Sequence, residues 1–160
     1  MDLTEKISEY LKNCYRYLTI RNRSEKEIRD YLAKKKAEPE IIETIVLRLK
    51  KQKFLNDETF ARSWVLQRAR LRPRGKRLLQ IELRQKGIAD DLIEQVLNEA
   101  HEEISDELTQ AKSLIERRVQ RLHDQPRQEI YNKVGAFLAR RGYGWEVIKK
   151  AIDEVLNETI

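Results

Sequence analysis

Cysteine, glycine, proline and long apolar runs are all scarce in this sequence of 160 residues, and each shortage excludes a class of protein. A single cysteine cannot form an internal disulfide, which fits a reducing compartment, so we expect a cytoplasmic protein. Five glycines and three prolines exclude a collagen-like or low-complexity chain and leave few tight turns for a β-rich fold. No run approaches the ~18 consecutive apolar residues that a membrane-spanning helix needs.

Groups for catalysis or metal binding are equally sparse. The chain has two histidines and one cysteine, without a cluster at metal-ligand spacing, and no glycine-rich phosphate loop. Cys14 lies among apolar and aromatic residues, so we expect it to be packed in the core. The sequence therefore predicts neither enzyme activity nor a bound cofactor or metal.

Two adjoining segments carry charges that are almost entirely of one sign, positive in the first and negative in the second. Residues 62–86 hold nine Lys and Arg and only one acid, Glu82, whereas residues 88–111 hold eight acids and no Lys or Arg. A strongly positive segment is typical of a protein that binds a polyanion or a charged protein surface. The alternative, that the two segments neutralise each other within the fold, stays open.

Apolar residues recur at helical spacing almost throughout, and the pattern occurs three times. An offset of 55 residues places L-R-Q-K-G at 83–87 over L-A-R-R-G at 138–142, and an offset of 51 finds an earlier copy. Each copy follows a further helical run, over residues 4–21, 58–71 and 105–122. We therefore predict an all-α fold of three tandem three-helix repeats in an elongated, curved array. The expected repeats are residues 1–54, 55–103 and 104–160.

Local signals place several helix ends. Ser24 with Glu27 predicts a capping box. Gly87 and Gly142 follow helical runs, as glycines at helix ends do, whereas Lys36 occupies that position in the first copy, so we expect its turn to close differently. Three prolines are predicted to take the first position of a helix: Pro39, Pro73 and Pro126.

The third helix of the second copy argues against a sequence-specific DNA reader. A recognition helix enters a groove lined by phosphates, but this helix, near residues 90–101, carries four acids. The phosphates of DNA would repel these four carboxylates. We therefore expect three-helix units that do not read the major groove.

Basic residues gather instead around the connection between the first two helices of the second copy. Arg77 and Arg84 are seven residues apart, on the face opposite Leu79 and Leu83, and should point outward. Arginine predominates, and its planar fork suits phosphate and carboxylate groups. We predict a docking surface for a nucleic-acid backbone or an acidic protein patch, with a merely solvated face as the alternative. The residues expected to contribute are Arg70, Arg72, Arg74, Lys76, Arg77, Arg84, Arg140 and Arg141.

Three other residues have individual expectations. Arg68 lies within an apolar stripe, so we expect it to pair with a carboxylate such as Glu82 or to extend to solvent. Tyr143 aligns with Ile88 of the second copy and is predicted to lie in the core. Trp145 aligns with an acidic residue and is predicted either to be exposed at a helix start, where it could anchor a partner, or to pack on a neighbouring loop.

Four segments resemble the RecX family of regulatory proteins. Residues 55–61 match its L-x-D-E-x-F-A element, and residues 137–143 match F-L-x-R-R-G followed by an aromatic residue. Residues 75–88 resemble the central signature G-x-x-x-I-x-x-E-L-x-x-K-G-I, with Leu79 in place of isoleucine. Residues 23–28 resemble the start of the family's first repeat. These segments occur in the family's order and cover essentially the whole chain.

The resemblance implies a negative modulator of the RecA recombinase, built from tandem three-helix repeats, that binds in the groove of the RecA–DNA filament. Such proteins reduce ATP hydrolysis, strand exchange and co-protease activity, and so modulate DNA repair and the SOS response. The expected partners are the RecA filament and, weakly and without sequence specificity, single- or double-stranded DNA. We expect a monomer without membrane contact. The alternatives are a stand-alone DNA-binding protein and a purely structural adaptor.

Overall fold

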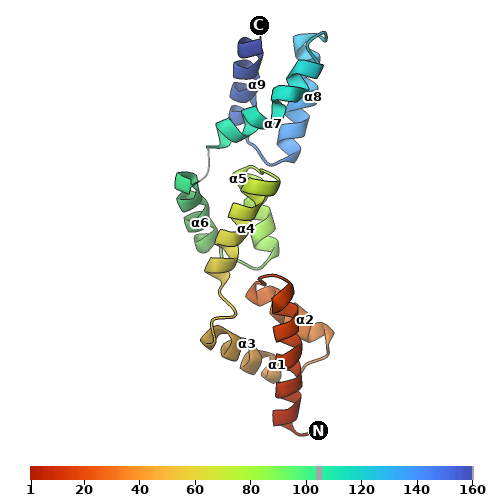
Figure 1. Ribbon diagram of the computed structural model, residues 1–160, viewed down its shortest axis with the longest axis vertical. Helices are drawn as coiled ribbons and strands as arrows, with labels where there is room; N and C mark the ends of the chain where they lie inside the picture. The colour runs from red at the N-terminus through yellow and green to blue at the C-terminus, as the bar shows by residue number, and fades with distance from the viewer. Residues whose placement is uncertain (104–105, 160) are drawn as a thin grey trace. The chain divides into compact units, whose positions relative to one another are not determined.

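The computed structural model describes residues 1–103 and 106–159, which form nine α-helices and no strand. The helices fall into three successive trios, as Figure 1 shows, so the predicted all-α repeat fold is confirmed. The first trio is α1 (Leu3–Ile20), α2 (Glu25–Lys34) and α3 (Pro39–Lys51). The second is α4 (Asp57–Leu71), α5 (Lys76–Gln85) and α6 (Asp90–Glu103). The third is α7 (Glu107–Arg121), α8 (Arg127–Arg140) and α9 (Trp145–Thr159).

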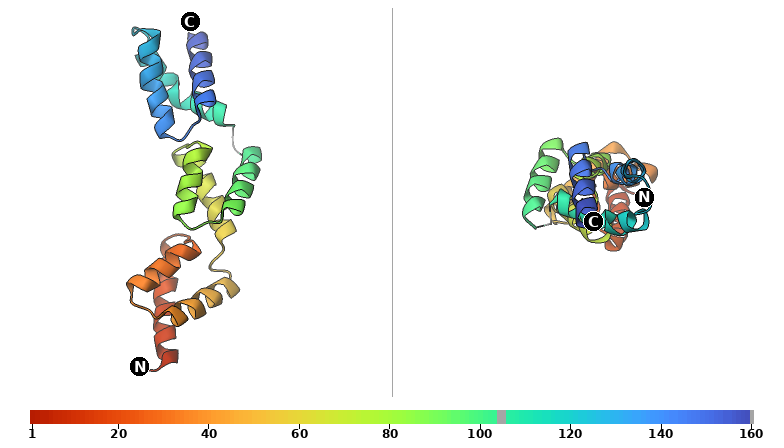
Figure 2. Two further views of the ribbon diagram at one scale, coloured as in Figure 1. Left: turned by 180° about the vertical axis from the view of Figure 1, so that it is seen from behind. Right: turned by 90° about the horizontal axis from the view of Figure 1, so that it is seen from above.

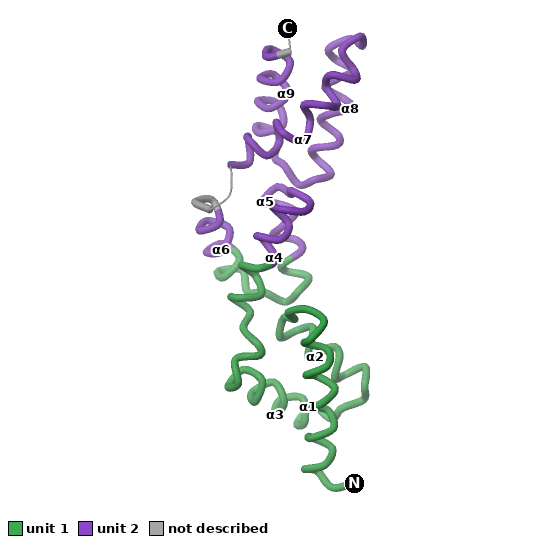
Figure 3. The backbone as a smooth tube through the Cα atoms, viewed as in Figure 1, with its two compact units in different colours: residues 1–63, 83–93 green, residues 64–82, 94–160 purple. Residues whose placement is uncertain are grey.

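The chain divides into two compact units that cut across the second trio. One comprises residues 1–63 and 83–93, and the other comprises residues 64–82 and 94–160 (Figure 3). The first trio lies wholly in one unit and the third wholly in the other. The expected repeat borders at 54/55 and 103/104 stay predictions, and residue 104 lies outside the described residues.

The repeat is visible in the burial of equivalent residues. Leu32, Leu83 and Leu138, which the alignment places at one position, are each fully buried near the end of a second helix. The equivalent positions of the third helices, where Ile45 aligns with Val96, are buried as well. Burying a leucine or isoleucine side chain contributes about 1.5–3 kcal/mol, so the shared apolar positions account for the shared trio.

The first trio packs α1 and α2 against α3 around its own core. Cys14 is fully buried there, as predicted, and burial raises the pKa of its thiol to about 11. A thiol with so high a pKa holds little reactive thiolate, which fits a packing role. The other buried members of this core are Leu11, Ile28, Leu32, Ile41, Ile45, Val46, Leu49 and Leu55.

The third trio packs α7 and α8 on α9. Figure 2 shows these three helices from behind, in its left view. Tyr143 is 4% exposed in its core, which confirms the prediction. Burial first, and then the nearby Glu107 charge, raise the pKa of the Tyr143 phenol, so this hydroxyl stays protonated. None of the described helices is both long enough and apolar enough to cross a membrane.

The turn after the second helix closes in the same way in all three trios, and this corrects the expectation for Lys36. Lys36 takes a left-handed φ of 63°, beside 77° at Gly87 and 89° at Gly142. A lysine can adopt this conformation at a cost of roughly 1–2 kcal/mol. The next amide donates to the carbonyl of the buried leucine each time: Ala37 to Leu32 at 3.0 Å, Ile88 to Leu83 at 3.0 Å and Tyr143 to Leu138 at 3.2 Å.

Helix starts agree with the sequence in part. Ser24 and Glu27 form the predicted capping box at the start of α2, with each side chain accepting from the other's backbone N–H, at 3.2 and 3.0 Å. Pro39 is the first residue of α3, as predicted. Pro126 directly precedes α8, one position earlier than predicted.

Pro73 does not begin a helix, so that prediction is wrong. The helix α5 starts three residues later, at Lys76. Between them, Gly75 donates its N–H to the carbonyl of Arg141 at 2.8 Å. This bond links residue 75 to the third trio.

Candidate partner-binding site

The connection between α4 and α5 carries five cations, which we call the corner cluster: Arg70, Arg72, Arg74, Lys76 and Arg77. The helix α4 ends at Leu71, and the Arg72 N–H still donates to the Arg68 carbonyl at 2.9 Å. Pro73 has no N–H to continue this pattern and disfavours a helical residue before it. The chain therefore turns with the cations close together.

Three members of the corner cluster are exposed and unpaired. Among the described residues, no carboxylate pairs with the guanidinium group of Arg70, Arg72 or Arg77, and all three side chains face solvent. Leu71, between the first two, is 73% exposed. The corner cluster thus presents several positive charges and one exposed apolar side chain, a composition suited to a negatively charged partner surface.

Arg74 is partly buried and pairs with Glu82. Its guanidinium Nη1 lies 2.7 Å from one Glu82 oxygen, while Arg68 Nε, at 3.4 Å, and Trp64 Nε1, at 2.9 Å, approach the other. The Arg68 guanidinium also stacks 4.5 Å from the centroid of the Trp64 ring. The expected pairing of Arg68 with Glu82 is therefore confirmed. The role of Glu82 in fixing Arg74 could not be read from the sequence, because the two residues lie on different elements.

Two hydrogen bonds donated by backbone N–H groups attach the corner cluster to the third trio. One is the Gly75–Arg141 bond described above, and the other runs from the Lys76 N–H to Glu107 Oε1 at 2.6 Å. A Cβ atom on Gly75 would lie 2.3 Å from the Gly142 carbonyl oxygen, so only glycine allows this approach. The structure thus brings Arg141 beside the corner cluster, with the exposed Arg140 next to it in sequence.

Arg84, at the end of α5, belongs to the other compact unit. Its Nε lies 2.7 Å from Asp90 Oδ1, and both side chains are exposed. An exposed pair of this kind contributes little, about 0–1 kcal/mol. Partial neutralisation of the basic segment by the acidic one therefore occurs at Arg84, but not at Arg70, Arg72 or Arg77.

Trp145 begins α9 and is 65% exposed, as expected for a partner anchor. It lines a groove of about 500 Å³ between α8 and α9, together with Tyr131, Ile148 and the small residues Gly135 and Ala139. Aromatic side chains in such positions are common anchors of protein interfaces. Within the described residues, no three His, Cys, Asp or Glu side chains are placed to hold a metal ion.

The three helix trios define a tandem three-helix repeat protein, and its α4–α5 connection presents exposed cations. Three family models match successive stretches of the chain. They describe the first, second and third three-helix domains of RecX, over residues 11–49, 56–97 and 105–152 respectively. The chain belongs to the RecX family of regulatory proteins, which are non-enzymatic regulators.

Individual relatives agree with this assignment. The chain is 35% identical to regulatory protein RecX of Bacillus pumilus, over 88% of this chain and 53% of that protein. It is 34% identical to regulatory protein RecX of Prosthecochloris aestuarii, over 88% and 89% respectively. The Bacillus and Listeria relatives are longer proteins, and the chain spans about half of their length.

Two crystal structures share the fold. RecX from Lactobacillus salivarius superposes with a TM-score of 0.85 over 99% of this chain and all of that one, at 23% identity. A second structure, of regulatory protein RecX, gives a TM-score of 0.80 and 25% identity, over 94% of this chain and 73% of the other.

Proposed function

We propose that this chain is a negative modulator of the RecA recombinase and acts by binding the RecA–DNA filament in the cytoplasm. Its membership of the RecX family supports the choice of partner. The observation that carries the proposal is the set of unpaired guanidinium groups at Arg70, Arg72 and Arg77. A nucleoprotein filament presents both phosphates and acidic side chains, and arginine binds either in a bidentate manner.

Several contacts must act together in this proposal. A single exposed ion pair contributes about 0.2–1 kcal/mol, so one arginine alone cannot hold a partner. The corner cluster supplies several cations, with Leu71 as an apolar contact among them. Binding in the filament groove also depends on the elongated array expected from the sequence, which stays a prediction. A chain bound in this way would reduce ATP hydrolysis, strand exchange and co-protease activity together.

Charge reversal tests the proposal directly. The triple variant R70E/R72E/R77E changes only exposed side chains without an ion pair in the described structure. We expect it to lose inhibition of the RecA ATPase on single-stranded DNA. The control K12E/R16E/K149E reverses three other exposed cations and should inhibit like the wild type. Full inhibition by the folded corner variant would eliminate this cluster as the contact.

The second candidate function is stand-alone binding of DNA without sequence specificity, which the same exposed arginines favour. Direct phosphate contacts would make log K fall with log salt by about 0.7 per contact on single strands. Titration of DNA at two salt concentrations without RecA separates the two functions. Tight and steeply salt-dependent binding, combined with no inhibition of RecA, would favour this second function.

A further inference from the structure

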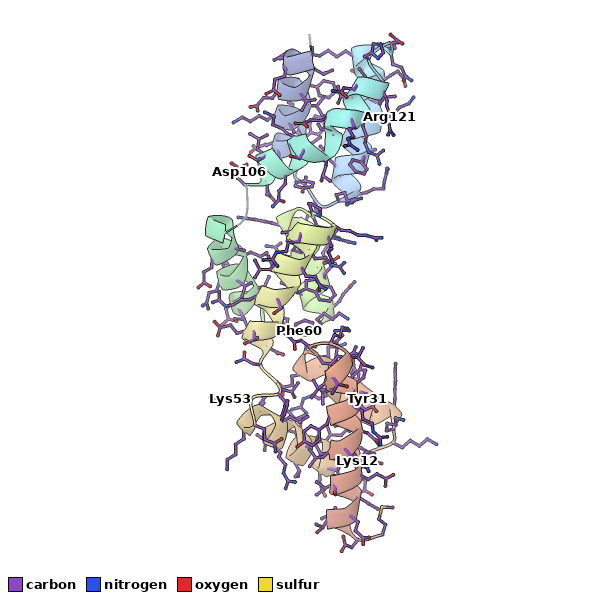
Figure 4. All side chains as sticks on the ribbon, viewed as in Figure 1. Lys12, Tyr31, Lys53, Phe60, Asp106 and Arg121 are labelled. Atoms are coloured by element: carbon purple, nitrogen blue, oxygen red, sulfur yellow. The ribbon has the colours of Figure 1, made fainter. Side chains whose placement is uncertain are left out.

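A second group of cations surrounds a pocket on the third trio, and none of these cations is among the residues that the sequence singled out. The pocket has a volume of about 210 Å³ and lies where α7 passes α8; Figure 4 labels Arg121 on its α7 side. We call it the α7–α8 pocket. Its lining residues are Arg118, Arg121, Leu122, Lys133 and Val134.

The positive charge of the α7–α8 pocket is not neutralised within the described structure. None of its lining residues is acidic, and no carboxylate pairs with Arg118, Arg121 or Lys133. Lys133 Nζ donates instead to the neutral side chain of Gln125, at 2.8 Å. Glu129, one turn before Lys133 on α8, forms no ion pair with it. Three cations around one opening raise the local concentration of anions.

Arg118 is held in place by an aromatic ring. Its guanidinium carbon lies 3.8 Å from the centroid of Phe137, close enough for a cation–π contact. This contact restrains the position of the guanidinium group, and no carboxylate among the described residues pairs with its N–H donors. The pocket is therefore partly preorganised, because one of its three cations does not need to be ordered when a ligand binds.

The same ring links the α7–α8 pocket to the corner cluster. Arg141 also lies over Phe137, with its guanidinium carbon 5.1 Å from the centroid. The carbonyl of Arg141 in turn accepts the hydrogen bond from Gly75, between Arg74 and Lys76. A chain of contacts therefore runs from the corner cluster through Arg141 and Phe137 to Arg118 in the pocket, all within one compact unit.

We propose that the α7–α8 pocket binds a phosphate group of a single-stranded nucleic-acid backbone. This inference rests on the proposed function, in which the partner carries DNA, and it assigns the phosphate contact to the third repeat. A phosphate offers several acceptor oxygens to the donors of Arg118, Arg121 and Lys133, and the continuous series of cations suits a polymer of evenly spaced negative charges. Leu122, which is only partly buried, supplies apolar surface on which a sugar can pack.

A DNA titration without RecA tests this site. Fluorescence anisotropy of a labelled single-stranded oligonucleotide would be followed at about 50 mM and about 200 mM salt, a range over which phosphate contacts weaken strongly. We expect R121E/K133E to bind about tenfold more weakly and to lower the salt slope by about 1.4, since each contact contributes about 0.7 on single strands. The control K149E/K150E makes the same change in charge on the exposed surface of α9 and should keep the wild-type slope.

Two results would overturn the inference: wild-type affinity and slope in R121E/K133E, or no measurable DNA binding by the wild-type chain at the lower salt concentration. Circular dichroism establishes that the variants fold, and R121Q/K133Q carries the test if charge reversal prevents folding. A chain that binds DNA through the pocket but does not inhibit RecA would contradict the proposed function alone. A chain whose R121E/K133E variant loses RecA inhibition but binds DNA normally would show that the pocket takes a protein carboxylate, which contradicts the inference.

Discussion

Glu107, the first residue of α7, accepts a hydrogen bond at 2.6 Å from the backbone N–H of Lys76, the first residue of α5. The same relationship occurs one repeat earlier, where Asp57 at the start of α4 accepts from the Glu25 N–H at the start of α2, at 2.9 Å. The first N–H groups of a helix have no partner within it and carry partial positive charge. The second and third repeats therefore each cap the second helix of the repeat before them.

Removing one of these caps should weaken the joint between two repeats. We expect Glu107→Ala to lower the free energy of unfolding by about 1 kcal/mol, as loss of a capping side chain commonly does. Hydrogen exchange should show faster exchange of the Lys76 amide in particular. Glu116→Ala, at an exposed position on the same helix, should change neither quantity. Unchanged protection of the Lys76 amide in E107A would contradict the capping role.

Gly142 should tolerate no side chain. A Cβ atom there would lie 2.3 Å from the Leu78 Cβ and 2.7 Å from the Leu78 N atom, and its φ of 89° is unfavourable for any L-residue. We expect Gly142→Ala to destabilise the protein by more than about 2 kcal/mol, since the left-handed conformation alone costs roughly 1–2. Gly144→Ala is the matched control, because nothing lies within 4 Å of its added Cβ. Chemical denaturation of both variants measures the difference, and equal stabilities would refute the packing argument.

Lys36 offers the opposite test. It holds the left-handed conformation with an exposed side chain, whereas the equivalent Gly87 is also crowded, with an added Cβ 2.5 Å from that of Lys26. Lys36→Gly should therefore raise the free energy of unfolding by about 1 kcal/mol, because glycine adopts positive φ without a steric penalty. Lys34→Gly, in the last turn of α2, should instead lower it by about 0.5–1 kcal/mol. A thermal melt that ranks K36G below the wild type would contradict this reading of the turn.

Glu27 should make stability depend on acid pH. Burial acts to raise the pKa of its carboxyl, but hydrogen bonds from Arg21, Lys86 and the Ser24 backbone outweigh it and lower the pKa to about 2. Because the folded pKa lies below the ordinary value of 4.5, the stabilisation is present above about pH 4.5 and is lost as pH falls towards 2.

The variant Glu27→Gln should remove this dependence. At neutral pH it should be less stable by up to about 3 kcal/mol, since each pKa unit corresponds to 1.36 kcal/mol. Its denaturation midpoint should also fall less than that of the wild type between pH 4.5 and 2. Glu9→Gln, at an exposed position on α1, is the control for the change of charge. Parallel pH profiles for wild type and E27Q would exclude Glu27 as the group responsible.

Much of the fold could be predicted because its determinants are local. The spacing of Leu32, Leu83 and Leu138 placed three helices and their buried faces, and Gly87 and Gly142 marked two turns. Pro73 misled the prediction because proline is also common just after the end of a helix, and it lies two residues beyond the last residue of α4. The expectation for the Lys36 turn was wrong because a lysine can adopt the same left-handed φ as glycine, although at a higher cost in free energy.

The candidate site was less accessible from the sequence. The exposure of Trp145 is one of two expectations drawn from its alignment with an acidic residue. The pairing of Arg68 is one of two expectations drawn from its place in an apolar stripe. Contacts between residues far apart in sequence, such as that of Glu107 with Lys76, have no local signal. Arg118 and Arg121 are one helical turn apart, which could have indicated a cationic face, but their relation to Lys133 on the next helix appears only in the structure.

The most direct test of the account compares the affinity of one labelled chain for a RecA–single-stranded DNA filament and for the same DNA without RecA. If the chain is a filament modulator, it should bind the filament at least about tenfold more tightly, a difference of about 1.4 kcal/mol. R70E/R72E/R77E should lose most of that difference. Equal affinity of the wild-type chain for naked DNA and for the filament would contradict the account.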